Sequence, residues 1–215
     1  MMNELRSPRA ENTRELILTA AERLFAERGL LAVSNRQVSE AAGQGNNAAV
    51  GYHVGTKADL IRAVARRHLD PMEQRRRRLL LRHDGSQEPR ILVTVLVHPF
   101  TDHLAGLGRP TWYARFAAQV MTDPLHRAVI IEEALEAPTM QAVAEGLARC
   151  LPELPPDALA ARQHMMRNLI VHTCAEQERA LAEGNGDPVA AWAGTAAALT
   201  DAITGLLTAP VTSGD

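Results

Sequence analysis

Residues 34–60 of this 215-residue chain read SNRQVSEAAGQGNNAAVGYHVGTKADL, a stretch that predicts two short helices separated by a tight turn. Ser34 is a favourable N-cap and Gln37, three residues later, completes a capping box, so the first helix is expected to begin here. Gly43 ends that helix, because glycine adopts the left-handed conformation at little cost. An asparagine of the turn then provides an N-cap for a second helix over residues 48–53. The pattern is typical of a helix-turn-helix, whose second helix enters the major groove of DNA.

The composition is that of a soluble helical protein. Hydrophobic residues make up 46% of the chain, enough for a core, and aromatic residues only 3%, while alanine and leucine are abundant, which favours helices over strands. Cys150 and Cys174 are too few for a disulfide framework, so a reducing cytoplasm is the expected location. The N-terminal stretch MMNELRSPRAEN has no apolar segment of a signal peptide, and no stretch was expected to span a membrane.

Charge is divided unevenly along the chain. Residues 1–83 contain 15 Lys or Arg against 9 Asp or Glu, whereas residues 84–215 contain 8 against 16. The N-terminal part is therefore the part suited to a polyanion. Four consecutive arginines, residues 75–78, fit a solvated helix face better than a DNA contact, because they lie roughly five turns or more beyond the second short helix.

The chain is predicted to be all-α, because no alternating pattern of useful length suggests a strand. The expected regions are a flexible arm, a three-helix DNA-binding domain and a larger helical domain for ligand binding and dimerisation, at residues 1–11, 12–58 and 59–215. Within the larger domain, glycine and proline positions predict helices at residues 89–105, 110–121, 124–149 with a break near Pro138, 156–182 and 188–208.

Two longer helices are expected on either side of the helix-turn-helix. The first begins at the cap Asn12 and ends at Gly29, and its apolar residues at helical spacing supply the small domain's core. The other is capped by Thr56 with Asp59, and Pro71 is expected to kink or divide it.

The last two predicted helices indicate a homodimer. Apolar side chains line one face of residues 159–173, and residues 190–209 are rich in Ala, Gly, Leu and Thr. Small residues let a neighbouring helix approach closely, and this apolar surface is too wide for a lone surface helix. A four-helix bundle formed by two helices of each subunit is therefore expected, with burial inside the monomer as the alternative.

Residues 52–60, YHVGTKADL, resemble a signature of the TetR-type transcriptional repressors, Tyr-His-Phe-x-[Ser/Thr]-Lys-x-x-Leu. The resemblance covers about residues 12–70, and the later helices match in number, length and placement. Val54 stands where the family has Phe, and the turn looks one residue longer than the commonest form, which leaves the register of the base contacts open. The resemblance implies a ligand-responsive repressor that binds a palindromic operator as a homodimer.

Candidate phosphate contacts follow from this resemblance. It gives that role to Tyr52, His53 and Lys57, and a phenol, an imidazole N–H and an ammonium beside a helix N-terminus are suitable donors. Packing within the small domain is the alternative for Tyr52 and His53. Arg36, at the start of the first short helix, is also expected to reach a backbone phosphate, with a position in solvent as the alternative.

Candidate base contacts lie at the start of the second short helix. An amide pairs bidentately with adenine, and a small side chain permits close approach to a base edge. The alternative for the asparagines is a role in capping and turn formation only. The candidates are Asn46, Asn47 and Ala48.

A candidate effector site lies in the larger domain. Methionine and aromatic walls with a few polar groups suit an apolar small molecule, although the same residues at helical spacing also build cores. Trp112 and Phe116, one turn apart, are expected to wall the cavity. The candidates are His98, His103, Trp112, Phe116, Met121, Met165, Asn168 and His172.

Enzyme function is not expected. The chain has no GxSxG, HExxH, P-loop or Rossmann fingerprint, and its histidines lack the spacing of metal ligands, so neither a cofactor nor a metal is predicted. The remaining alternative is a helical protein-interaction module whose helix-turn-helix is structural and whose acidic second half offers the binding surface.

Overall fold

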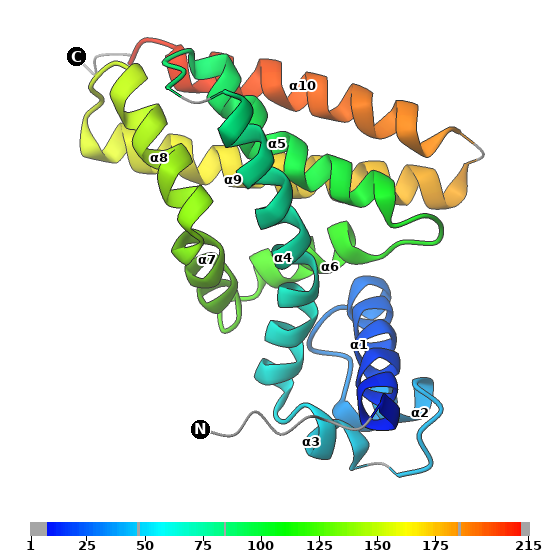
Figure 1. The fold of residues 1–215 in the computed structure, drawn as a ribbon. Coiled ribbons are helices and arrows are strands. Elements are labelled where there is room, and N and C mark those ends of the chain that lie inside the picture. The colour runs from blue at the N-terminus through cyan, green and yellow to red at the C-terminus, as the bar shows by residue number, and fades with distance from the viewer. Residues whose placement is uncertain (1–7, 47, 84, 185, 212–215) are drawn as a thin grey trace.

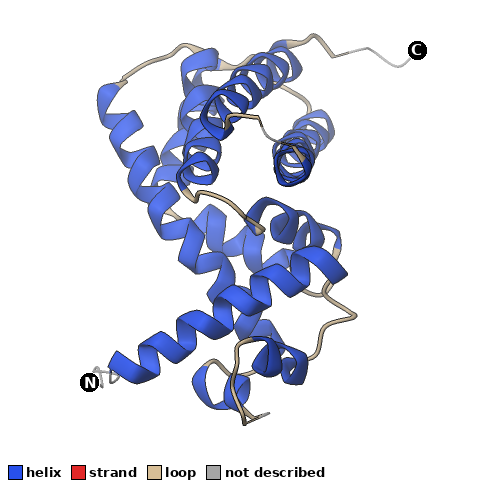
Figure 2. Cartoon of the chain, turned by 90° about the vertical axis from the view of Figure 1, so that its right-hand side faces the viewer, coloured by secondary structure: helices blue, strands red, loops and turns tan. Residues whose placement is uncertain are grey.

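The computed structural model describes residues 8–46, 48–83, 85–184 and 186–211, and every regular element within them is a helix. Figure 1 shows α1–α3 grouped at one end of the molecule and α5, α9 and α10 at the other, with the long α4 running between them. Figure 2 shows the same elements from the side, all of them helices joined by loops. The predicted all-α class is confirmed. The helices are α1 (Pro8–Arg28), α2 (Asn35–Ala41), α3 (Ala49–His53), α4 (Lys57–Arg82), α5 (Pro89–Gly106), α6 (Tyr113–Thr122), α7 (Arg127–Glu136), α8 (Pro138–Cys150), α9 (Pro156–Glu183) and α10 (Pro188–Thr208).

The small domain is built around α1. Ile17 and Phe25 of α1 are fully buried, together with Val38 of α2 and Val50 of α3. The helix begins at Pro8, so the prediction that it starts at a cap on Asn12, after a flexible arm of residues 1–11, is wrong at residues 8–11. Proline is favoured in the first turn of a helix, where its missing N–H costs nothing.

The helix α4 is continuous from Lys57 to Arg82. Its predicted capping box is present, with Thr56 accepting from the backbone of Asp59 and Asp59 accepting from the backbone of Thr56. Pro71 lies inside the helix and does not divide it. The buried side chains of His68 and Met72 lie on either side of the proline along the helix, so packing holds the helix together where the proline removes a hydrogen bond.

The sequence predicts a solvated helix face for the arginine run of residues 75–78, and this is correct only in part. Arg77 and Arg78 are exposed, but Arg76 is buried and its Nη1 lies 3.4 Å from the hydroxyl of Thr139 and 3.5 Å from Glu73. The reason is helical spacing, because Arg76 lies one turn beyond the buried Met72 and so faces α8.

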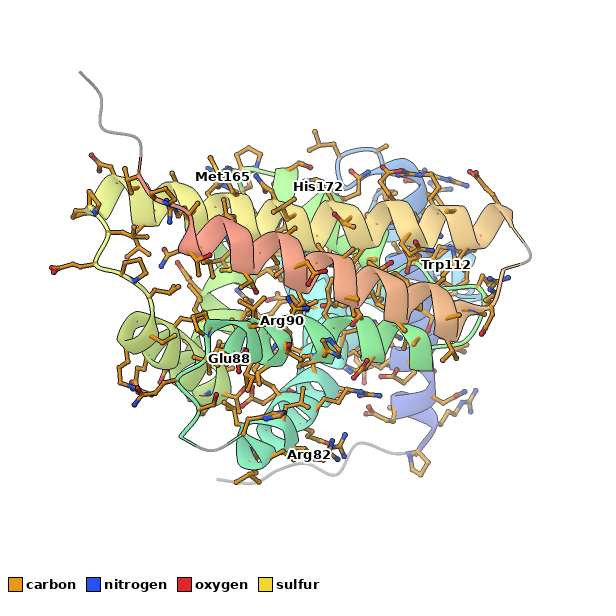
Figure 3. The ribbon with its side chains drawn as sticks, turned by 90° about the horizontal axis from the view of Figure 1, so that it is seen from above. Arg82, Glu88, Arg90, Trp112, Met165 and His172 are labelled. Atoms are coloured by element: carbon orange, nitrogen blue, oxygen red, sulfur yellow. The ribbon has the colours of Figure 1, made fainter. Side chains whose placement is uncertain are left out.

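The larger domain is layered on α5 and α9. The helix α10 packs against α5 and α9, and α9 also packs against α6. Figure 3 shows α9 and α10 side by side when the molecule is seen from above. The predicted break near Pro138 is confirmed, since α7 ends at Glu136 and α8 begins at Pro138.

Two buried charges connect distant parts of this domain. Glu178 of α9 accepts hydrogen bonds from the backbone N–H groups of Ala114 (3.2 Å) and Arg115 (3.0 Å), so its carboxylate caps the start of α6. Arg162, near the start of α9, donates to the backbone oxygens of Leu207 (3.0 Å) and Ala209 (2.7 Å) at the end of α10. Both side chains place opposite charge where a helix end leaves unpaired backbone groups.

Candidate DNA-binding surface and effector site

The helix-turn-helix has the predicted geometry over its described residues. Ser34 and Gln37 form the capping box of α2, and Gly43 after its end has a φ of +68°, the left-handed conformation that favours glycine. The N-cap of α3 is Ala48, which has no side-chain cap, so the predicted asparagine cap is wrong. Instead, Asn46 Oδ1 accepts from the N–H of Ala48 at 2.9 Å and shapes the turn.

The base-contact candidates are placed only in part. Asn46 and Ala48 are exposed beside the start of α3, where a base edge would be approached. The side chain of Asn46 already accepts one hydrogen bond but keeps its amide donors for other partners. Asn47 lies outside the described residues, so its predicted role stays a prediction.

Tyr52 is the most prominent side chain of α3. It is 84% exposed, and its ring stands edge-on to that of His53 with the centroids 4.9 Å apart. The alternative that Tyr52 packs against α1 is therefore wrong, and the phenol is free to meet a phosphate from solvent. His53 is half-buried beside Val54, which packs against the core in the position of the family's Phe.

Lys57 points inward instead of into solvent. Its ammonium donates to the backbone oxygens of Val33 (2.8 Å) and Leu30, and Nζ lies 5.8 Å from the ring centroid of Phe25. Burial lowers the pKa of Lys57, against the opposing charge of Asp123. The ammonium thus satisfies carbonyls of the α1–α2 loop, a role that sequence reasoning missed, and its predicted phosphate contact stays a prediction.

Arg36 is exposed near the start of α2. Its Nε donates to Glu40 at 2.8 Å, one turn along the helix. An exposed pair of this kind is worth little and exchanges easily, so a phosphate would compete with Glu40 for the guanidinium. The predicted phosphate role is compatible with this position and stays a prediction.

Between α1, α3 and α4 lies a cleft of about 240 Å³ that the sequence did not predict. Arg62 and Arg66 of α4 border it and both pair with Glu133 of α7, at 2.8 Å and 3.1 Å. In the sequence, the two arginines are spaced by one helical turn near the start of a helix. This spacing places them on one face, but it does not show that α7 lies opposite them. The cleft is lined by Arg14, His53, Val54, Asp59, Arg62, Ala63 and Arg66.

A buried chain of hydrogen bonds ties α1 to α4 and α5. His68 Nε2 lies 2.9 Å from Glu22 Oε2, and His68 Nδ1 lies 2.8 Å from His103 Nε2. Every ring nitrogen in these two contacts therefore has a hydrogen-bond partner. Arg67 also pairs with Glu22, and Tyr113 stacks on His68 with the ring centroids 3.7 Å apart. His103, predicted to contact an effector, is instead part of this chain.

Burial and charge set the protonation states of Glu22 and His103. Burial lowers the pKa of His103 to about 4, with the neighbouring His68 and the charge of Arg75 acting in the same direction. Burial by itself would raise the pKa of Glu22, but the hydrogen bonds and charges of His68 and Arg67 outweigh it and hold the pKa below its ordinary value. Glu22 is therefore ionised and His103 neutral near pH 7.

The remaining effector candidates are not brought together. Phe116 is buried, 6.2 Å from the ring of Phe25 between α6 and α1, so its role is in the core. Met165 and His172 are exposed along α9, and Figure 3 shows Met165 well apart from Trp112. The other four candidates are half-buried and come from different elements. They are His98 on α5, Trp112 just before α6, Met121 on α6 and Asn168 on α9.

A second cavity, of about 330 Å³, lies between the α5–α6 loop and the hairpin of α9 and α10. None of the eight predicted effector residues lines it. Its walls combine the apolar Pro110, Leu181 and Trp192 with the charged Arg109 and Glu178. Sequence reasoning missed these residues because they come from three separate segments that only the tertiary fold brings together.

The outer face of α10 carries a stripe of small residues. By length and composition, α10 is the one helix in the described part of the chain that could cross a membrane, contrary to the prediction that no stretch would qualify. One face, with Trp192 and Ile203, packs inside the protein, as in the core helices of soluble proteins. The opposite face is exposed and continues onto the exposed apolar residues of α9, such as Met165. The exposed small residues are Ala190, Ala193, Gly194, Ala197, Ala198, Ala202 and Gly205.

Comparisons with known proteins agree with this architecture. The family described as bacterial regulatory proteins, tetR family, matches residues 17–64, and the tetracyclin repressor-like C-terminal domain matches residues 94–205. No curated protein matches the chain.

Three solved structures share the fold. NalD of Pseudomonas aeruginosa, the secondary repressor of the MexAB-OprM multidrug efflux pump, is 23% identical, with 94% of this chain and 100% of that chain covered and a TM-score of 0.58. AmtR of Mycobacterium smegmatis is 20% identical, with 89% and 92% covered and a TM-score of 0.56. The multidrug binding protein EbrR, complexed with imidazole, is 20% identical, with 99% and 100% covered and a TM-score of 0.50. With both of its parts matched, the chain belongs to the TetR family of bacterial regulatory proteins.

Proposed function

We propose that this chain is a cytoplasmic transcriptional repressor that binds operator DNA as a homodimer and releases it when a small molecule binds the larger domain. The observation that carries the proposal is α3, a short helix after a tight turn that presents Tyr52, 84% exposed, at the end of the molecule opposite α5, α9 and α10. An exposed phenol at that place suits a DNA phosphate better than a protein core.

Dimerisation supports the proposal because one α3 covers only one half-site. Two recognition helices must lie roughly 34–36 Å apart to enter successive major grooves. The exposed face of α9 and α10 has the small and apolar side chains that a four-helix bundle between subunits needs. Exposed glycines at Gly194 and Gly205, with no atom near the position of a Cβ, allow a partner helix to approach closely.

The effector is proposed to bind the cavity beside Trp192, in place of the site predicted around Trp112 and Phe116. Its volume of about 330 Å³ is within the range of small-molecule pockets. A flat apolar molecule with one polar group would pack on Pro110 and Trp192 and meet the charge of Arg109 or Glu178. NalD and EbrR, which are described with multidrug efflux and multidrug binding, make an apolar effector the reasonable first choice.

The test is a titration of labelled DNA with the purified protein, read by fluorescence anisotropy. The target is the promoter of the neighbouring genes, compared with a random duplex of about 30 base pairs, which is long enough for two half-sites one helical turn apart. Sequence-specific binding with a steep salt dependence is expected. A folded dimer that binds neither duplex at low salt would contradict the proposal and favour a protein-interaction module.

The dimer is tested by Ala197→Arg on the exposed face of α10. We expect a monomer in light scattering and weaker operator binding, because an arginine would be buried against the partner helix without a counter-charge. Gln74→Arg, an exposed position on α4, is the control and should remain dimeric. An unchanged mass for Ala197→Arg would place the interface elsewhere.

Two single-tryptophan variants locate the effector. A compound that releases DNA should change the emission of Trp192 in a Trp112→Phe background and leave that of Trp112 nearly unchanged in a Trp192→Phe background. The reverse pattern would restore the site predicted around Trp112.

A further inference from the structure

The cleft between α1, α3 and α4 gathers positive charge from α1 and α4 and an imidazole from α3. Arg14 comes from α1, His53 is the last residue of α3, and Arg62 and Arg66 lie in the first three turns of α4. The cleft begins directly beside Tyr52, the exposed phenol of α3. Its position is therefore continuous with the surface proposed to meet DNA.

Asp59 is the carboxylate in the lining of the cleft, and it has other partners. It accepts from the N–H of Thr56 at 3.0 Å and from its hydroxyl at 2.7 Å, as part of the capping box of α4. These hydrogen bonds lower the pKa of Asp59, with Arg62 contributing through its charge. Arg62 pairs with Asp59 through Nη1 at 3.1 Å, and Arg14 lies 3.6 Å from Glu15. The lining still holds three arginines against one carboxylate, Asp59, which suits an anion.

Glu133 of α7 supplies an anion at the edge of the cleft. Its Oε1 lies 2.8 Å from Nε of Arg62 and its Oε2 lies 3.1 Å from Nε of Arg66, so each oxygen serves one arginine. The carboxylate is 14% exposed, whereas Arg66 is 64% exposed. Two oxygens shared between two guanidinium groups is also the arrangement that a phosphate adopts with arginine.

We propose that this cleft binds a phosphate of the DNA backbone, and that Glu133 takes the place of that phosphate on Arg62 and Arg66 when DNA is absent. The proposal rests on the DNA-binding function proposed above. Arg62 and Arg66 lie about 8 Å and 14 Å along α4 from Lys57, the first residue of the helix. Because α7 lies within the region matched by the C-terminal domain family, the ion pairs join the larger domain to the DNA-binding surface.

Competition between Glu133 and a phosphate would couple DNA binding to the position of α7 in the larger domain. A phosphate and Glu133 cannot both occupy the forks of the same two arginines, so binding one weakens the other. An effector that stabilises the contact between α7 and α4 therefore lowers the affinity for DNA. By thermodynamic linkage, bound DNA lowers the affinity for that effector by the same factor.

The first test removes one arginine from the cleft. Arg66→Gln is compared with Arg78→Gln, an exposed arginine of the same helix about 18 Å further along it. The probe is the labelled random duplex of about 30 base pairs at several salt concentrations. We expect Arg66→Gln to weaken binding and to lower the slope of log affinity against log salt by about 0.9 per subunit, while Arg78→Gln stays close to wild type.

The second test removes the competing carboxylate. Glu133→Gln should strengthen binding roughly threefold to tenfold at about 0.1 M salt, because a phosphate then meets Arg62 and Arg66 without the competing carboxylate of α7. Glu136→Gln, an exposed glutamate on the same helix, makes the same change in net charge and is the control. In an Arg66→Gln background the gain from Glu133→Gln should shrink, which a general charge effect would not produce.

The outcomes separate this proposal from the function on which it rests. All variants are first compared with wild type by thermal melting, and only folded proteins are titrated. If wild type binds no duplex, the proposed function fails. If wild type binds but Arg66→Gln equals Arg78→Gln, or Glu133→Gln equals Glu136→Gln, the cleft receives no phosphate and DNA binding through α3 stands.

Discussion

The two sides of α4 hold charged groups in different ways. Towards α1 and α5, the chain of Glu22, His68 and His103 is buried and every member has a partner. Towards α7, Glu133, which is 14% exposed, pairs with Arg62 and Arg66, whose side chains are 33% and 64% exposed. The same kinds of side chain therefore serve different purposes. Buried groups fix the position of α4 because an unpaired charge there is costly, whereas arginines that reach solvent exchange partners at lower cost.

The largest expected effect comes from breaking the buried side. Glu22→Leu should lower the free energy of unfolding by about 3 kcal/mol, because it leaves Arg67 and His68 without their buried carboxylate. Glu15→Gln is a matched control on the same helix, since Glu15 also pairs with Arg67, at 3.5 Å, but is half-exposed. We expect the control to cost less than about 1 kcal/mol in urea unfolding. Equal losses in the two variants would show that burial does not distinguish the pairs.

The next effect is a pH dependence of stability. In the unfolded chain His103 takes up a proton near its ordinary pKa of 6.5, whereas in the folded protein its pKa is about 4. The unfolded state therefore binds more protons between these values, and stability falls as the pH is lowered from about 6.5 to about 4, by at most on the order of 3 kcal/mol. Glu22, with its lowered pKa, adds a loss in the same direction at the acidic end.

His103→Gln tests this assignment. The amide N–H of glutamine still donates to His68 but does not titrate, so unfolding monitored by circular dichroism should depend less on pH between about 4 and 6.5 than in wild type. An identical pH profile in the variant would assign the titration to another group.

A smaller effect is expected at Lys57. Lys57→Met leaves the carbonyls of Leu30 and Val33 without their ammonium donor, so we expect a loss of about 1–2 kcal/mol in stability. A lysine that served only a phosphate would leave the melting temperature unchanged. The salt slope of DNA binding, measured where both proteins are folded, reports separately whether the third N–H reaches a phosphate.

The smallest effect on stability is expected on the exposed side. Glu133→Gln should change the free energy of unfolding by less than about 1 kcal/mol, although it changes DNA affinity. The contrast with Glu22→Leu in the same denaturation experiment measures the difference between the two sides of α4. A loss as large as that of Glu22→Leu would mean that Glu133 fixes α4 in the fold and is not free to exchange for a phosphate.

The sequence by itself determined most of the helices and several of their ends. Capping at Ser34 and Thr56, the glycine after α2 and the break near Pro138 are signals between residues a few positions apart, and the structure confirms them. Such signals act through local backbone hydrogen bonds, so they are readable without the fold. The error at residues 8–11 is of the same local kind, since both Pro8 and Asn12 are acceptable starts.

Only the tertiary structure decided what the charged and aromatic side chains do. Glu22, His68 and His103 meet across gaps of 46 and 35 residues, and Glu178 caps a helix that begins 65 positions earlier. The positions of His103 and Phe116 on their helices fit a core and a ligand pocket equally well. In the structure His103 contacts α4 and Phe116 contacts α1, so both belong to the core. The physical reason is that burial and partnership depend on which helices lie against one another, and local periodicity says which face is buried but not what it is buried against.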